Sequence, residues 1–188
     1  LQVFKATISS KEKEKNTYNN TKNFAVEVID QKTNIAIISA ISHPDLGAMK
    51  RAIESNVQRK VTIAKPNEIK SLQDYNVLIL YQPTTDFKTI FENNKGTGIN
   101  TFIITGNNTD FNFLNQQQDN LNFKMSGQKE DYLSVFNGQF NLFAADNIGF
   151  ENLPPLQNAF GTVTTKGAVS VLLSSKIRSI DTNSPLLA

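Results

Sequence analysis

The chain has 188 residues, of which 39% are hydrophobic and 19% are charged, so one globular domain with a buried core, or one domain plus a fragment, is expected. Its 19 basic and 17 acidic residues give a formal charge of +2, which is too small to indicate a nucleic-acid partner. The absence of cysteine excludes disulfides and thiolate chemistry, and the single histidine, His43, excludes most sites built on several imidazoles.

The first 30 residues predict a β-hairpin. An extended run and a charged turn at residues 11–15 precede Phe24, Val26 and Val28, which alternate as in a half-buried strand. Two strands alone are marginally stable in water. The hairpin is therefore expected either to add to a neighbouring sheet or to be the end of a truncated sandwich domain.

Residues 31–188 predict an α/β domain, because short apolar runs alternate with amphipathic segments. Buried strands are predicted at residues 35–38, 61–64, 77–81 and 101–105. Helices are predicted at residues 44–56, 86–94 and 110–114, with a short turn near residues 69–72. This order predicts a mostly parallel, doubly wound sheet, and it resembles the order in flavodoxin-like and amidotransferase-like folds.

After about residue 120 the pattern becomes β-rich and the helical period disappears. Strands are predicted at residues 121–125, 132–136, 140–143, 169–173 and 177–180, and a rigid connection at Pro154-Pro155. The apolar run at residues 184–188 is interpreted as the start of a strand, so the α/β domain is predicted to be truncated at its C-terminus.

The first candidate site is Ser42-His43-Pro44-Asp45, which follows the first predicted parallel strand. Ligands of open parallel sheets bind at that edge. The string resembles the His-Pro-Asp-Asp-Glu motif of zinc-dependent N-acetylglucosaminyl deacetylases, but leucine and glycine follow where that motif has its ligand aspartate and its glutamate. One histidine and one carboxylate do not make a catalytic zinc site. No metal is therefore expected, and a helix start capped by Ser42 or Asp45 is the simpler interpretation.

The second candidate site is the exit from the fourth predicted strand, residues 104–110, where a strand, a sharp turn and a helix resemble a nucleophile elbow. The order of elements resembles the class I glutamine amidotransferase-like fold, whose elbow carries a cysteine paired with a later histidine and a glutamate. Thr105 stands at the strand end here and no histidine follows, so the resemblance implies that the catalytic triad is absent. The alternative interpretation is a turn capped by Thr109 and Asp110. No glycine-rich phosphate loop follows the first strand, so no cofactor is expected.

A wider resemblance covers essentially the whole chain. The segments that carry it are residues 19–30, 42–52, 106–110, 153–156, 160–161, 181–182 and 185–187. Together they resemble one region of uncharacterised, membrane-anchored bacterial envelope proteins that are similar to von Willebrand factor A domain-associated proteins. In that family an immunoglobulin-like segment precedes an amidotransferase-like domain without its triad, within a longer polypeptide.

This resemblance implies an extracytoplasmic location in the periplasm or cell envelope. It also implies that the partners are other domains of the same polypeptide or other envelope proteins. The chain has no run of about 18 apolar residues, so direct membrane insertion of this segment is not expected.

Three functions stay open at this stage. The preferred one is a non-catalytic interaction or scaffold module, because nucleophile, base and metal ligands are missing. The second is a binding domain for a small anionic ligand, held by helix N-termini in the crevice at the strand ends. The candidate residues of that crevice are Ser42, His43, Asp45, Gln82, Thr105, Asn107 and Asp110. The third is a hydrolase with His43 as base, which requires a hydroxyl within about 3.2 Å of the ring and a third group that orients it.

Overall fold

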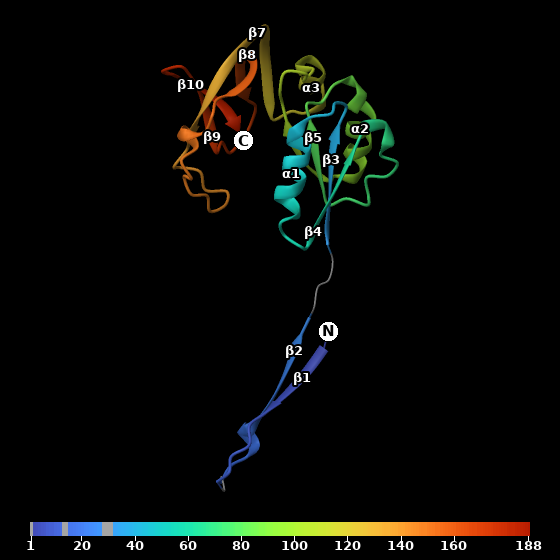
Figure 1. Ribbon diagram of the computed structural model, residues 1–188, viewed down its shortest axis with the longest axis vertical. Helices are drawn as coiled ribbons and strands as arrows, with labels where there is room; N and C mark the ends of the chain where they lie inside the picture. Colours follow the sequence, from blue (N-terminus) through green and yellow to red (C-terminus); the bar gives the residue numbers. More distant parts are fainter. Residues whose placement is uncertain (1, 13–14, 28–31) are drawn as a thin grey trace. The chain divides into compact units, whose positions relative to one another are not determined.

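The chain forms two compact units, residues 1–32 and residues 33–188 (Figure 1). In the computed structural model the described residues are 2–12, 15–27 and 32–188. The predicted strand residue Val28 and part of the predicted charged turn lie outside the described residues. Within the described residues, no helix is both long enough and apolar enough to cross a lipid bilayer.

The N-terminal unit is the predicted β-hairpin. Strand β1 (Gln2–Thr7) pairs antiparallel with β2 (Thr21–Val26), and a short 3-10 helix, η1 (Tyr18–Asn20), precedes β2. Phe4 lies opposite Phe24, and their rings stack with centroids 5.7 Å apart. Both rings are close to half exposed, at 45% and 49%. All residues of the two strands are exposed, so the hairpin has no core of its own.

The second unit begins with a four-stranded parallel sheet. Its strands are β3 (Thr33–Ser39), β4 (Arg59–Ala64), β5 (Val77–Tyr81) and β6 (Asn100–Ile104), in the order β4-β3-β5-β6. The four predicted parallel strands are therefore confirmed within one or two residues. The two central strands carry continuous apolar runs, residues 35–38 of β3 and 77–81 of β5, because both faces of the sheet are covered there.

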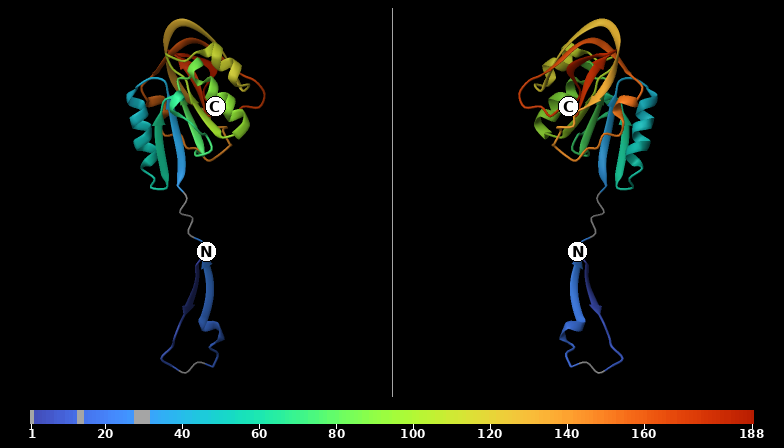
Figure 2. Two further views of the ribbon diagram at one scale, coloured as in Figure 1. Left: turned by 90° about the vertical axis from the view of Figure 1, so that its right-hand side faces the viewer. Right: turned by 90° about the vertical axis from the view of Figure 1, so that its left-hand side faces the viewer.

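Helices cover both faces of this sheet (Figure 2). Helix α1 (Pro44–Glu54) packs Leu46 on one face, with Met49 and Ile53 beside it. The Glu54 carboxylate accepts hydrogen bonds from the Lys50 ammonium at 2.8 Å and from the Val61 N–H at 2.9 Å, which joins the end of α1 to β4. The Lys50 bond first, and the Val61 N–H next, lower the pKa of Glu54.

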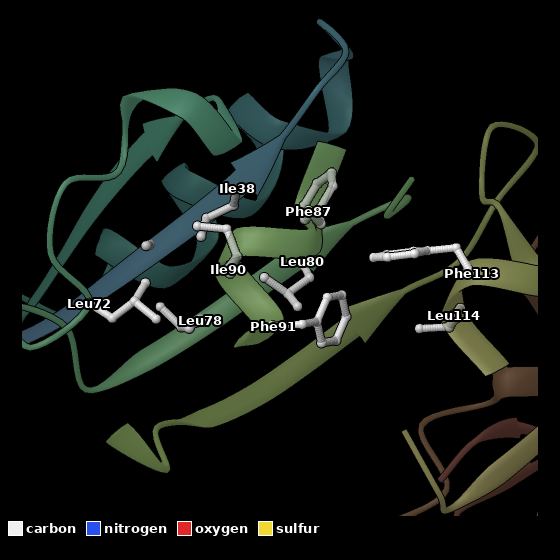
Figure 3. Close-up of a cluster of buried hydrophobic side chains, with 10 residues drawn as sticks. Ile38, Leu72, Leu78, Leu80, Phe87, Ile90, Phe91, Phe113 and Leu114 are labelled. Carbon is white, nitrogen blue, oxygen red and sulfur yellow. The ribbon is translucent and has the colours of Figure 1, made fainter. Parts of the chain in front are cut away.

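The opposite face carries the larger core cluster (Figure 3). A short 3-10 turn, η3 (Thr85–Phe87), leads into α2 (Lys88–Thr97), and α3 (Phe111–Gln117) follows β6. Their buried side chains meet Ala36, Ile38, Leu78 and Leu80 of the sheet; they are Phe87, Ile90, Phe91, Phe113 and Leu114. The three predicted helices are confirmed, and the predicted turn near residues 69–72 is preceded by the short helix η2 (Pro66–Glu68).

The C-terminal part is a four-stranded antiparallel sheet in the order β10-β9-β7-β8. Its strands are β7 (Leu121–Phe136), β8 (Leu156–Thr165), β9 (Leu173–Ile177) and β10 (Ile180–Leu187), with a 3-10 turn, η4 (Phe150–Asn152), between β7 and β8. The coarse expectation of an α/β chain with a β-rich C-terminal portion is therefore confirmed.

Several predicted strand boundaries in this part are wrong. Residues 121–125 and 132–136 belong to one strand, β7, which continues through an irregularity between Met125 and Lys129. Residues 140–143 form no strand; Phe140 instead packs edge-on against Phe143, with ring centroids 4.9 Å apart.

The last two predicted strands are also displaced. Residues 169–173 overlap β9 only at Leu173, and residues 177–180 contain the turn between β9 and β10. Residues 184–187 lie in the second half of β10, where Leu187 pairs with Leu173, and are not the start of a strand. β8 and β10 are rich in Thr, Asn and Ser, so local hydrophobicity gives little sign of them.

Candidate functional site at the carboxyl edge of the parallel sheet

The predicted site residues follow three neighbouring strands at the edge where those strands end. Ser42, His43 and Asp45 follow β3, Gln82 follows β5, and the loop at residues 105–110 follows β6. Because β5 lies between β3 and β6, its end joins the other two loops. Two hydrogen-bonded groups form at this edge, one around Tyr81 and the other around Gln82. Only some of the predicted site residues belong to them.

The first group consists of His43, Asp45 and Tyr81. His43 is the N-cap of α1, and its Nδ1 accepts the Asp45 backbone N–H at 3.3 Å. The Tyr81 hydroxyl lies 3.0 Å from the same Nδ1 and donates to the Asp45 carboxylate at 2.9 Å. The predicted cap by Ser42 or Asp45 is therefore wrong, whereas Pro44 does occupy the first helical turn.

Tyr81 is the group's buried member, with 3% of its surface exposed. Burial first, and the bond to Asp45 next, raise the pKa of its hydroxyl, while a contact with the Gln82 amide acts in the opposite direction. The hydroxyl therefore stays protonated at neutral pH and serves as a hydrogen-bond donor. The distance required for a His43-based hydrolase is met, but by a phenol whose raised pKa opposes its activation as a nucleophile.

The second group is built around Gln82. This residue has a φ of +50°, which is unusual for a residue other than glycine, and its side chain is buried. Its N–H donates to the Ile104 carbonyl at 2.7 Å. Its Oε1 accepts the backbone N–H of Asn108 at 2.8 Å and the Asn108 side-chain amide at 3.2 Å. Gln82 thus joins the end of β5 to the loop after β6.

The loop after β6 is the predicted capped turn. The Gly106 N–H donates to the Thr109 hydroxyl at 2.8 Å, and the Thr109 N–H donates to the Gly106 carbonyl at 3.0 Å. The Asp110 carboxylate accepts the Phe113 N–H at 2.9 Å and so caps α3. A side chain on Gly106 would overlap the Gln82 carboxamide, with its Cβ only 2.6 Å from Cδ. A larger residue at position 106 would therefore displace the Gln82 carboxamide.

The remaining predicted site residues make few side-chain hydrogen bonds, or none, within the described structure. Thr105 accepts a 3.4 Å hydrogen bond from the Asn158 side chain of β8, which connects the two sheets. Ser42 and Asn107 are exposed and have no side-chain hydrogen bond in the part of the chain that the structure describes. The sequence interpretation missed Tyr81 and Asn108. A tyrosine that ends an apolar strand is a signal for the former, because a buried phenol hydroxyl usually finds a partner.

The charges at this edge already complement the helix ends. Asp45 lies in the first turn of α1 and Asp110 caps α3, so carboxylates of the chain occupy both helix N-termini. Among residues 2–12, 15–27 and 32–188, no group of three or more His, Asp or Glu side chains is placed to hold a metal ion. The edge is thus built mainly to join loops to each other.

Comparison of the chain with protein-family models, with curated proteins and with solved structures finds no match.

The raised pKa of Tyr81 predicts a loss of stability at alkaline pH. A tyrosine in the unfolded chain ionises at about pH 10, whereas Tyr81 in the folded chain ionises at a higher pH. The free energy of unfolding should therefore fall as the pH rises from about 10 through the folded pKa. Tyr132, another of the four tyrosines, also has a raised pKa, and burial is the largest cause. In a spectrophotometric titration, Tyr81→Phe and Tyr132→Phe should each remove one late-titrating component. Loss of a component that titrates at the ordinary value in Tyr81→Phe would contradict this assignment.

The close approach of Gly106 to Gln82 predicts a coupled pair. Gly106→Ala should displace the Gln82 carboxamide from Asn108 and lower the free energy of unfolding by about 1–3 kcal/mol, measured by urea denaturation. Gly127→Ala is the matched control, since nothing lies within 4 Å of a Cβ there. In the Gln82→Ala background, Gly106→Ala should cost clearly less. An equal cost in both backgrounds would show that the Gln82 side chain is not the group displaced.

Proposed function

We propose that this chain is a non-catalytic interaction module of a larger bacterial cell-envelope protein. The observation that carries the proposal is the use of the polar groups at the carboxyl edge of the parallel sheet. His43 caps α1, Gln82 bonds Asn108, and Asp110 caps α3. The atoms that make these bonds are already engaged within the chain, so a substrate that used the same atoms would have to displace an internal partner, and that loss opposes binding.

The strand order supports the proposed relation to amidotransferase-like domains. The parallel order β4-β3-β5-β6, with helices on both faces, is compatible with a doubly wound, flavodoxin-like sheet, and this supports the proposal. In such a domain Thr105 would stand at the elbow, and here its hydroxyl is bonded to Asn158. We propose that the second unit is an amidotransferase-like domain without its triad, in an extracytoplasmic protein.

The β1–β2 hairpin supports the interaction role. In the antiparallel register Phe4, Phe24 and Val26 share one face of the hairpin, and each of them is at least 40% exposed. A two-stranded ribbon with an open apolar face gains stability when another sheet covers that face. We propose that this face belongs to the end of an immunoglobulin-like sandwich supplied by the same polypeptide or by an envelope partner.

The two alternatives receive less support. An anionic ligand at the helix N-termini would lie beside the carboxylates of Asp45 and Asp110, which repel it. A hydrolase would need a nucleophile near His43, and the hydroxyl within reach is the buried phenol of Tyr81.

Site-specific photo-crosslinking of the natural full-length protein in its own cells tests the proposed role. A photoreactive phenylalanine analogue at position 24 should cross-link to another domain or to an envelope protein, with a yield several-fold above that at position 23. Asn23 is the matched control, because neighbouring strand residues point to opposite faces. Equal or absent cross-linking at the two positions would contradict the proposal, as would His43-dependent turnover of ester substrates by the purified chain.

A further inference from the structure

An open cavity of about 500 Å³ lies at the surface of the antiparallel sheet, and its lining residues are different from those of the carboxyl edge described above. Its walls come from the end of β7, from the segment around η4 and from the turn between β9 and β10. This volume lies within the range of small-molecule sites, about 300–1,000 Å³. The cavity therefore has room for a ligand of modest size.

Some of the charged side chains that line the cavity have an ion-pair or hydrogen-bond partner, and one has none among the described residues. Lys176 pairs with Asp181 at 4.0 Å, and Glu151 accepts a hydrogen bond from Asn147 at 3.3 Å. The Arg178 guanidinium has no ion pair and no hydrogen bond within the described part of the chain. Arg178 is exposed, so the five N–H donors of its guanidinium face solvent at the cavity wall and are available to a ligand.

The backbone at Arg178 is costly for an arginine. Ile177 pairs with Ile180, so Arg178 is the first residue of a two-residue hairpin turn, and its φ is +55°. Glycine or asparagine is the usual residue at that position of such turns. A residue kept in a rarely populated conformation, without an internal partner for its side chain, indicates a role outside the folding of the turn.

The cavity also has an aromatic lining residue. Phe136 lines the cavity and stacks on Phe150, with ring centroids 5.9 Å apart and the rings within 9° of parallel. The Ser134 hydroxyl donates to the Phe150 carbonyl at 2.7 Å, which holds η4 against β7. Leu133 and Val135 of the same strand also border the cavity.

We propose that this cavity binds a small organic monocarboxylate with a flat apolar body. The carboxylate would pair with the Arg178 guanidinium, whose planar donor fork matches it. The apolar body would lie against Phe136. Glu151 and Asp181 also line the cavity, and their negative charges disfavour a ligand that carries more than one. The cavity thus selects a monoanion over phosphate.

Titration of the whole chain with benzoate, followed by NMR, tests the site. Benzoate should shift the amide signals of Ser134, Phe136 and Arg178 saturably, with a Kd in the millimolar range, and benzyl alcohol and inorganic phosphate should bind at least about tenfold more weakly. Arg178→Gly should weaken benzoate binding by a similar factor while the melting temperature stays equal or rises, because glycine suits the turn. Arg51→Gln, which removes a positive charge from exposed α1, should leave the affinity unchanged.

Three results would overturn the proposal. These are the absence of any saturable shift with benzoate, an unchanged benzoate affinity in Arg178→Gly, and phosphate binding as tight as that of benzoate. Arg178→Gln provides a second variant that removes the charge and keeps a side chain at the turn, so the test does not depend on the fold of one variant.

Discussion

The burial of β5 on both faces is the constraint on which the rest of the α/β part depends. Leu78 and Leu80 face the cluster under α2 and α3, whereas Ile79 and Tyr81 face the cluster under α1. A strand that is apolar on both sides and paired on both edges has a fixed register, because a shift by one residue would exchange its two faces. The position of Tyr81 at its end is therefore fixed, and the loops after β3 and β6 are held through Tyr81 and the following Gln82.

The sequence predicts the parallel sheet well and the antiparallel sheet poorly, for a physical reason. Strands buried on both faces are continuous apolar runs, and their helices carry local signals such as the αL glycine Gly98 and the cap Asp110. β8 and β10 are half-exposed and polar, so their pairing is decided by the neighbouring strands. The Tyr81 group was missed because Asp45 and His43 lie 36 and 38 residues before Tyr81 in the chain. No local sequence pattern indicates a contact over such a separation.

The two sheets differ in the charged groups that they offer to an anionic ligand. At the carboxyl edge of the parallel sheet, Asp45 and Asp110 fill the positions at helix N-termini that an external anion would take. In the antiparallel sheet, Arg178 lines a cavity with its guanidinium unpaired in the described structure. The proposed interaction role of the hairpin and the proposed carboxylate site of the cavity both lie outside the edge where α/β domains usually bind their ligands.

The central claim is that internal hydrogen bonds close the carboxyl edge, and amide hydrogen exchange of the whole chain tests it most directly. Asn108 is an exposed loop residue whose N–H donates to the buried Gln82 side chain. Its amide should therefore exchange slowly, and Gln82→Ala should bring its rate to that of neighbouring loop amides. Exchange of the Asn108 amide at the rate of an unprotected loop in the unmodified chain would contradict the claim, because the edge would then be open and available to a ligand.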